Sequence, residues 1–569
     1  MRGGTLRTQL TSDPSTFDVH LFLIGAQGFV WGVGSLLFTL EPGHLESPSL
    51  RVKGDIAESF ELSPDRLTLT AKIHPQARWS PSSPFLAPHV PASVFDRKID
   101  SEDVMASWDR FLQLGPGALE VANSKNANAP VTSVSTPDAE TVTFKLSQPD
   151  STLLPTMAVS NVGYFYLIPK EGRNDGIPFN RVMIGSGPFV IQEYTPSAGF
   201  VFQRNPNLEL RDPQKRPYLD RVEAPFISDP AQGQAQFRAG NIYGNPDGAN
   251  PPGVTANDVL AIKGDIPELL MYQNFGSDPH KITFGLQQNS PYIDKRVRQA
   301  MSYAWDRDLY IDTTYNVPEF EAQGIPMEHR WSSGSLAADL NGYPGGTYAP
   351  YWLDPKGEDF GPNSKILQYN PQEAKTLLRA ATGSDSLNTE AWWAVTNSFG
   401  PTTGNAIEIL TAMIAESGFN AQIKNLTQPE WFDRVQGKYS EHGNAFVITV
   451  DSGGPDPANY LFQHYHKAGT RSVHAGPDST GWTPDADPRV NTDIERMKTE
   501  FDESRRVNIA HDLQRYLADQ FYESRFPGGS NTYVMAWPAV RNGRVWIGDF
   551  PRQWANLWLD PSKRPLSSA

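Results

Sequence analysis

The sequence contains no cysteine among its 569 residues. Structural disulfides, a cysteine nucleophile and cysteine-based zinc sites are therefore excluded. The absence also fits an oxidising compartment, where a free thiol is a liability.

Long apolar runs and an excess of basic residues are also missing. A membrane-spanning helix needs roughly 18–20 consecutive apolar residues, and the most apolar window, Phe29–Leu40, is interrupted by glycines. The formal net charge is −15, without a long Lys/Arg run. Nucleic-acid binding needs a basic face, so this class of partner is excluded.

Catalytic motifs are absent as well. The sequence has no HExxH motif, no G-x-S-x-G elbow, no Walker loop and no G-x-G-x-x-G. His464, His466 and His474 lie close in sequence, but among prolines and glycines and without a carboxylate at matching spacing. We therefore predict no catalytic residue, no metal site and no cofactor. A glycosidase pair of Asp451 and Asp456 is the remaining enzyme hypothesis, and the Gly-Gly-Pro turn between them favours ligand contact or a hinge instead.

The order of elements predicts an α/β protein with more than one domain. A chain of this length exceeds the roughly 250–300 residues that one core supports. Strand-rich segments surround a lobe of alternating helices and strands, so the chain ends share one lobe and the chain crosses between lobes twice. Among the predicted helices, one is capped by Ser101, another covers Asp294–Tyr315, and a third, Asn370–Ala381, begins with a capping box of Asn370 and Glu373.

The stretch ITVDSGGPDPANYLFQHYH, residues 448–466, is a strand that ends on the acid Asp451. The carboxylate could cap the turn through the amides of Gly453 and Gly454. It could also face a ligand, because ligands bind beyond the carboxyl ends of strands in open α/β sheets. The two interpretations are compatible.

Aromatic residues supply candidate walls for a binding site. Trp392 and Trp393 are adjacent, and adjacent residues on a strand face opposite sides. One ring can therefore pack inward while the other faces a cavity, as an apolar wall for a sugar or a peptide side chain. Trp431 lies shortly before the Asp451 strand and is predicted to line the same cavity.

Five sequence blocks occur in an order that resembles one family of transport proteins. They are GGTLRTQLTSDPSTFD, DIAESFELSPDRLTLTAKIHPQARWS, IDSEDVMASWDR, GSGPFVIQEYTPSAGFVFQRNPN and FGLQQNSPYIDKRVRQAMSYAWDRD. Together they resemble the family 5 (peptide/nickel-type) extracellular solute-binding proteins of ABC importers, which include oligopeptide- and dipeptide-binding proteins. The resemblance runs nearly from end to end.

The resemblance implies a two-lobed, hinged periplasmic-binding-protein fold of type II (cluster C-like). Hinges are expected near residues 275–285 and 528–538. The implied domains are lobe I in residues 1–40, 169–278 and 530–569, a small inserted domain in 41–168, and lobe II in 279–529. The ligand would be enclosed between the lobes.

The resemblance also implies roles for individual residues. Asp451 stands where peptide binders pair with the ligand's α-ammonium group, and Trp431 stands where the family lines its pocket. The remaining predicted ligand contacts are Trp392, Trp393, Ser452, Asn289, Trp31 and Phe29. The segment TTGNAIEIL lacks the arginine that takes the ligand carboxylate in dipeptide binders. An oligosaccharide, whose hydroxyls would donate to Asp451, is therefore the alternative to an oligopeptide.

The implied partners are the ligand and the transmembrane subunits of an ABC permease. We expect a monomer that is exported to the periplasm or cell surface, and that is peripheral or lipid-anchored in its full-length form. The start MRGGTLRTQL fits either a natural start or one placed after a removed export signal.

Overall fold

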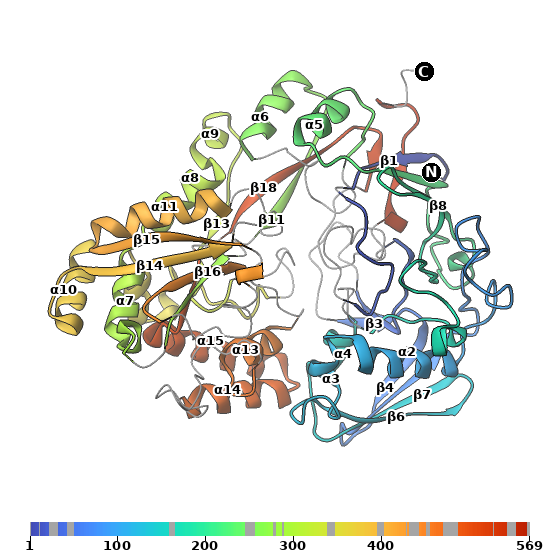
Figure 1. Cartoon of the computed structure of the whole chain (residues 1–569), viewed down its shortest axis with the longest axis horizontal. Helices are drawn as coiled ribbons and strands as arrows, with labels where there is room; N and C mark the ends of the chain where they lie inside the picture. Colours follow the sequence, from blue (N-terminus) through green and yellow to red (C-terminus); the bar gives the residue numbers. More distant parts are fainter. Residues whose placement is uncertain are drawn as a thin grey trace. The chain divides into compact units, whose positions relative to one another are not determined.

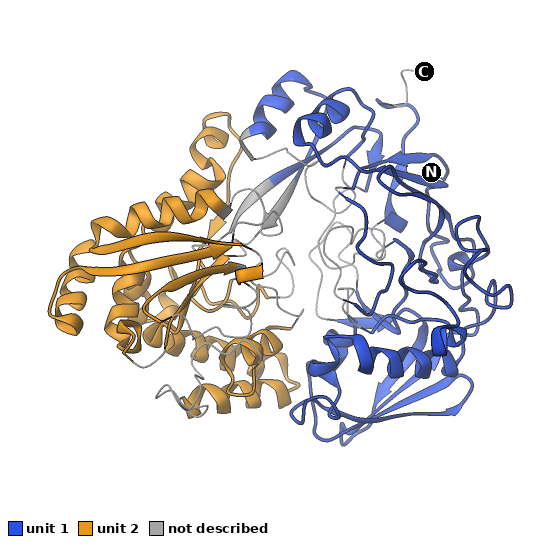
Figure 2. Ribbon diagram, in the orientation of Figure 1, with its two compact units in different colours: residues 1–274, 533–569 blue, residues 275–532 orange. Residues whose placement is uncertain are grey.

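The chain crosses twice between two compact units. Residues 1–274 and 533–569 form unit 1, and residues 275–532 form unit 2 (Figure 2). The crossings fall within β11 (Leu270–Gly276) and β18 (Gly529–Ala536), neighbouring strands of a three-stranded sheet that β13 (His329–Arg330) completes. The proposed small inserted domain stays a prediction.

This computed structural model describes most of the chain. The residues outside the description are 1, 11, 22–31, 42–50, 159–164, 245–255, 277–279, 287–288, 338–347, 395–402, 428, 432–442, 451–455, 470–486, 527–528, 543–553 and 566–569. No helix in the described parts combines the length and the apolar character that crossing a bilayer requires.

Unit 1 contains a sheet built around an antiparallel hairpin. Its strands are β1 (Thr5–Arg7), β8 (Phe189–Thr195), β9 (Gly199–Arg204) and β10 (Arg221–Pro225), in the order β1-β10-β9-β8. Asp13 fixes the hairpin turn, because its carboxylate accepts hydrogen bonds from the Ser197 amide at 2.9 Å and the Tyr194 hydroxyl at 2.8 Å. Burial and this carboxylate raise the pKa of Tyr194 to about 12.

A second sheet of unit 1 is antiparallel throughout and packs against one helix (Figure 1). Its strands are β4 (Ala57–Leu62), β5 (Thr68–Ile73), β6 (Val131–Asp138) and β7 (Thr141–Leu146), and the helix is α2 (Ser101–Leu114). The cap of α2 is Asp100 in a capping box with Asp103, so the prediction of Ser101 as the cap is wrong. Asp100 has the extended backbone that an N-cap requires, whereas Ser101 is already helical.

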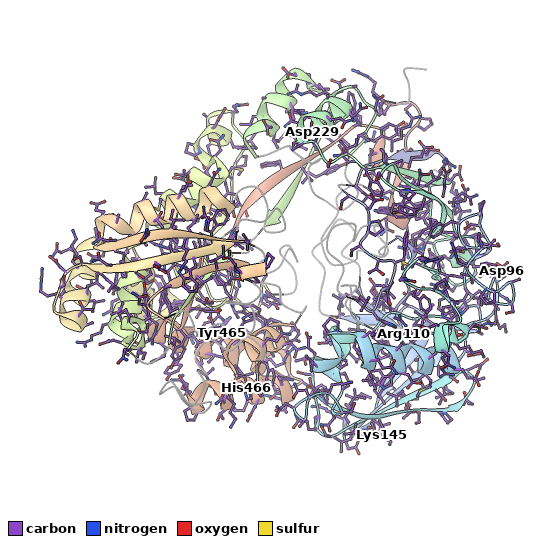
Figure 3. The ribbon with its side chains drawn as sticks, in the orientation of Figure 1. Asp96, Arg110, Lys145, Asp229, Tyr465 and His466 are labelled. Carbon is purple, nitrogen blue, oxygen red and sulfur yellow. The ribbon has the colours of Figure 1, made fainter. Side chains whose placement is uncertain are left out.

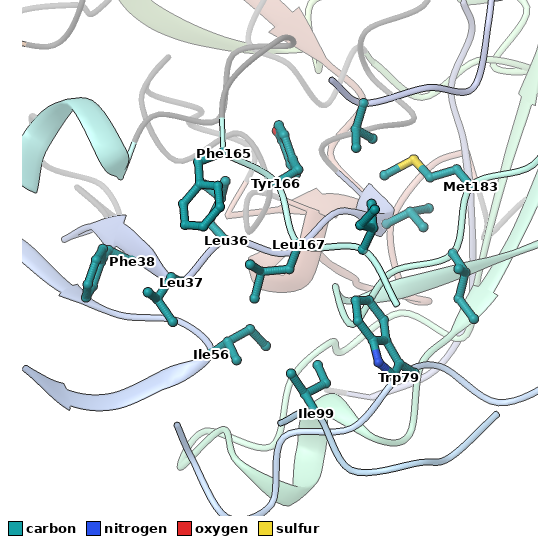
Figure 4. Close-up of a cluster of buried hydrophobic side chains, with 14 of the residues drawn as sticks. Leu36, Leu37, Phe38, Ile56, Trp79, Ile99, Phe165, Tyr166, Leu167 and Met183 are labelled. Atoms are coloured by element: carbon teal, nitrogen blue, oxygen red, sulfur yellow. The ribbon is translucent and has the colours of Figure 1, made fainter. Parts of the chain in front are cut away.

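The segment GSGPF packs flat against the backbone of residues 33–35. A Cβ at Gly185 would lie 1.9 Å from the Val33 carbonyl oxygen, and one at Gly187 would lie 2.7 Å from it. The Ser186 amide donates to the Ser35 hydroxyl at 2.7 Å. Glycine is therefore required at both positions by backbone contact rather than by ligand chemistry. Figure 4 shows part of the continuous buried cluster around this contact.

The remaining elements of unit 1 are short. They are β2 (Phe38–Leu40), β3 (Val52–Gly54), α3 (Ala118–Val121), α4 (Leu153–Met157), η1 (Lys170–Asp175), η2 (Leu208–Leu210), α5 (Pro230–Arg238), α6 (Ala256–Asp265), β19 (Val540–Arg541) and β20 (Trp558–Leu559).

Unit 2 is a mixed α/β layer. Its sheet contains β12 (His280–Phe284), β14 (Leu387–Ala394), β15 (Phe419–Leu426), β16 (Phe446–Val450) and β17 (Glu523–Arg525), in the order β15-β14-β16-β12-β17. β14 is parallel to β15 and β16, whereas β12 is antiparallel to β16 and β17. The helices are α7 (Lys295–Tyr303), α8 (Arg307–Tyr315), α9 (Val317–Ala322), α10 (Pro371–Thr382), α11 (Thr403–Glu416), α13 (Pro457–Tyr465), α14 (Pro488–Thr499) and α15 (Glu503–Gln520), with short 3-10 turns η3 (Pro291–Ile293), η5 (Glu358–Phe360) and η6 (Pro362–Leu367).

The helix predicted over residues 294–315 is two helices, α7 and α8. Asp306 ends the first run because its side chain caps α8 through the Leu309 amide at 2.9 Å. Asn370 caps α10 as predicted, because its side chain accepts from the Glu373 amide at 3.0 Å. The reciprocal half of the predicted capping box differs, since the Asn370 amide donates to the Tyr303 carbonyl at 2.8 Å.

Two buried arginines explain part of the VRQAMSYAWDRD block. Arg298 donates to the Gln520 carbonyl at 2.8 Å, and Arg307 donates to the carbonyl of Leu367. Burial lowers the pKa of Arg298 to about 10 and that of Arg307 to about 9. Main-chain carbonyls thus solvate both charges, and this part of the family pattern serves the core of unit 2.

Candidate functional site

The parallel strands of unit 2 bring three carboxyl ends to one edge of the sheet. β14, β15 and β16 end at Ala394, Leu426 and Val450. The β16 terminus is held in register, since Val450 pairs with His280 at the start of β12. Ligands of open α/β sheets bind at such an edge, and Asp451 comes directly after Val450 in the sequence.

Four of the predicted contact residues lie outside the part of the chain that the structure describes. Asp451, Ser452, Phe29 and Trp31 lie outside the described residues, so their ligand roles stay predictions. Asn289 is described: it is exposed, with a φ of 70°, just before η3. Its role also stays a prediction.

Trp392 and Trp431 pack together on one face of the sheet, close to its carboxyl edge. The cluster that they form also contains Ala394, Leu426 and Val447. Trp431 is 6% exposed and Trp392 is half-buried. The Trp392 indole N–H donates to Glu390 Oε2 at 2.6 Å, which orients the ring. Two tryptophans that lie 39 positions apart in sequence therefore form one aromatic wall.

Trp393 lies on the opposite face of the sheet from Trp392, as predicted for adjacent residues of a strand. A Cβ built on Gly404, near the start of α11, would lie 3.2 Å from the Trp393 ring, so this ring covers the helix. Its indole N–H donates to the Asn425 side chain of β15. Of the adjacent pair, Trp392 therefore shares a face with Trp431 and Trp393 packs on the helix-covered side.

Asp456 is tied into the core of unit 2. Its carboxylate caps α13 through the Ala458 amide at 2.8 Å. One guanidinium nitrogen of Arg506 donates to both Asp456 oxygens at 2.7 Å. The side chain of Asp456 is fully buried. Its acceptor capacity is thus used to hold the start of α13, five residues after Asp451.

A buried ionic cluster lies beneath α13 and was not predicted from the sequence. The Lys281 ammonium contacts Glu523 Oε2 at 2.7 Å and His464 Nδ1 at 2.7 Å. The hydroxyl of Tyr465, labelled in Figure 3, donates to Glu523 Oε1 at 2.6 Å. Burial and the Glu523 carboxylate raise the pKa of Tyr465 well above its usual range. The one available signal was a lysine inside the apolar strand HKITF.

The neighbouring histidine, His466, has a separate partner. Its Nε2 lies 3.0 Å from the Glu495 carboxylate of α14. Burial lowers the pKa of His466, although Glu495 opposes the shift. His464 and His466 thus contact different groups, and His474 lies outside the described residues.

Known proteins similar to this chain are transport proteins. A family model described as "Bacterial extracellular solute-binding proteins, family 5 Middle" matches residues 51–472. A Brucella ovis protein named as an ABC transporter peptide-binding protein is 26% identical over 471 residues, which span 81% of this chain and 76% of that protein. Di/tripeptide-binding protein 2 of Pseudomonas aeruginosa is 22% identical over 480 residues, which span 82% of this chain and 79% of that protein.

Solved structures show the same fold. The periplasmic binding protein DppA from Helicobacter pylori, in complex with the peptide STSA, matches 98% of this chain and 98% of its own with a TM-score of 0.69 and 17% identity. AgaA from A. tumefaciens R10, in complex with agropinic acid, matches 98% of this chain and 99% of its own with a TM-score of 0.68 and 19% identity. The predicted two-lobed α/β binding-protein fold is thereby confirmed. Because the family model spans well over half of the sequence, the chain belongs to family 5 of the bacterial extracellular solute-binding proteins.

Proposed function

We propose that this protein captures an oligopeptide outside the cytoplasm and delivers it to the transmembrane subunits of an ABC permease. Membership of family 5 carries the proposal. The names of the Brucella and Pseudomonas relatives and the peptide in the Helicobacter structure support peptide as the ligand. We further propose that the protein is monomeric, acts in the periplasm or at the cell surface, and catalyses no reaction.

The proposed ligand site is the carboxyl edge of the unit 2 sheet. Asp451 would accept hydrogen bonds from the peptide's ammonium group, a charge-assisted interaction that is about twice as strong as a neutral one. Trp431 and Trp392 would provide an apolar wall for a side chain. The buried anchor at Asp456 supports this assignment, since it fixes the chain a few residues beyond Asp451.

Ligand binding would be coupled to hinge motion. The chain passes between the units only near residues 274–275 and 532–533, so few backbone torsions need to change. A ligand that binds the closed form more tightly shifts the population toward it. A decrease in the radius of gyration on adding peptide, measured by small-angle X-ray scattering, would be the expected result.

An oligosaccharide is the second candidate ligand. The AgaA structure holds agropinic acid, so the fold also accepts ligands other than peptides. A half-buried Trp392 suits the flat face of a sugar ring as well as a peptide side chain. In that case Asp451 would accept hydrogen bonds from hydroxyl groups.

A thermal-shift panel of peptides and oligosaccharides tests the proposal. A ligand at 100 times its Kd stabilises the folded protein by about 2.7 kcal/mol. We expect stabilisation by peptides, loss of that stabilisation in Asp451→Asn, and its retention in Asp385→Asn, a control at an exposed acid. Stabilisation by oligosaccharides alone would reverse the ranking of the two ligands. Turnover of a glycoside or ester during a long incubation would contradict the absence of catalysis.

A further inference from the structure

One part of the sheet face that carries Trp392 is buried, and another part is exposed to solvent. Strand register and alternation place Lys281, Glu523, Trp392, Glu390 and Lys424 on this one face. Lys281 and Glu523 have no exposed side-chain area, whereas Glu390 and Lys424 keep 38% and 41% of theirs. The difference arises because α13 packs over the first pair, while Lys424 belongs to β15, an edge strand.

The neighbours of the Lys424 ammonium group orient it but, among the described residues, do not accept its hydrogen bonds. It lies 5.0 Å from the centroid of the Trp392 ring and 3.8 Å from Glu390 Oε2. The second distance exceeds hydrogen-bond length, and among the described residues the ammonium has no hydrogen-bond acceptor. Glu390 Oε2 already accepts the Trp392 N–H. The three donors of the lysine are therefore available to a group that arrives from solvent.

We propose that Lys424 binds a carboxylate of the ligand beside the aromatic wall and is a specificity-determining residue. This inference rests on the proposed function and adds the chemistry of one ligand group to it. The apolar part next to the carboxylate would pack on Trp392, and the carboxylate would accept hydrogen bonds from the ammonium. Glu390 would stay bonded to the indole, so the lysine keeps its orientation in the complex.

The position of Lys424 argues for a ligand contact rather than a stabilising surface pair. Exposed ion pairs contribute little to stability, and this one lacks a direct hydrogen bond. The residue stands two positions before the end of β15, near the carboxyl edge where ligands of such sheets bind. Lys424 also lies on the sheet face where Trp431 packs, and Trp431 is part of the aromatic wall of the proposed site.

The ligand carboxylate could belong to an acidic side chain or to the peptide C-terminus. Three probes distinguish them: Ala-Glu-Ala, its C-terminal amide, and Ala-Gln-Ala. Calorimetry at low salt would compare the wild-type protein with Lys424→Gln, with the charge-conserving Lys424→Arg, and with Lys365→Gln. Lys365 is an exposed lysine of η6 in the same unit and serves as the matched control.

We expect Lys424→Gln to weaken Ala-Glu-Ala binding about tenfold, equivalent to about 1.4 kcal/mol, with both control variants close to wild type. Loss of this difference with the amide assigns the C-terminal carboxylate, and its loss with Ala-Gln-Ala assigns the side chain. An equal effect on all three probes, or none, overturns the role of Lys424 while leaving peptide binding intact. If the wild-type protein binds none of the three, the result counts against both proposals.

Discussion

The buried pair of Asp456 and Arg506 should dominate the stability of the region around α13. Arg506 is 6% exposed and Asp456 is fully buried, so solvent does not screen their interaction. Asp456→Asn keeps an oxygen that can cap α13 but removes the charge. The Arg506 guanidinium then keeps the Tyr351 hydroxyl at 3.0 Å and the Met497 carbonyl at 3.1 Å, but loses the negative charge of Asp456.

The magnitude follows from the loss of one partner of a buried pair, which costs about 3–5 kcal/mol. Asparagine retains one acceptor, so we expect Asp456→Asn to lower the free energy of unfolding by about 3 kcal/mol, at the low end of that range. Asp456→Ala also removes the helix cap, which adds about 1 kcal/mol. The alanine variant should therefore be the less stable of the two.

Urea unfolding followed by tryptophan fluorescence measures both losses. The control is the adjacent Arg505, whose side chain is 65% exposed and which pairs with Glu500 at 2.6 Å. Because exposed side chains in ion pairs contribute little, Arg505→Gln should unfold at nearly the same urea concentration as the wild-type protein. The reasoning is refuted if Asp456→Asn is no less stable than Arg505→Gln.

Two further predictions concern unit 1. Gly185→Ala should destabilise the protein by at least about 3 kcal/mol, because its Cβ would lie 1.9 Å from the Val33 carbonyl oxygen. Gly264→Ala, at a helical glycine with nothing within 4 Å, should instead stabilise it slightly; similar melting temperatures for the two variants would contradict the contact. Burial lowers the pKa of His20 to about 4, so the unfolded chain binds a proton that the folded chain does not between roughly pH 6.5 and that value. Stability should therefore be lost as pH falls through this window, and a melting temperature that declines as steeply in His20→Gln would show that another group is responsible.

Part of the site could be predicted because its causes are local. Alternation along β14 was enough to place Trp392 and Trp393 on opposite faces. The strand that ends before Asp451 and the cap at Asn370 follow from patterns within a few residues. The ordered sequence blocks identified the family, and the family model confirms it.

Other features depend on residues that are distant in sequence. Lys281 and Glu523 are 242 positions apart, and Asp456 and Arg506 are 50 apart. No local pattern indicates that a lysine in an apolar strand will meet its counter-ion on another strand. The cap of α2 could not be predicted either, although the cause is local. Asp100 and Ser101 both have side chains that can cap a helix, and the backbone conformation determines that Asp100 is the cap.

The sequence by itself determined the family, the alternation of helices and strands, and the acid at the end of the β16 strand. Only the tertiary structure decided that Asp456 pairs with Arg506, that Trp392 joins Trp431 on one face, and that Lys424 stands beside that wall without a hydrogen-bond acceptor among the described residues. The physical reason is that periodicity and capping act over a few residues. Charge pairing and ring packing instead depend on which strands become neighbours in the sheet.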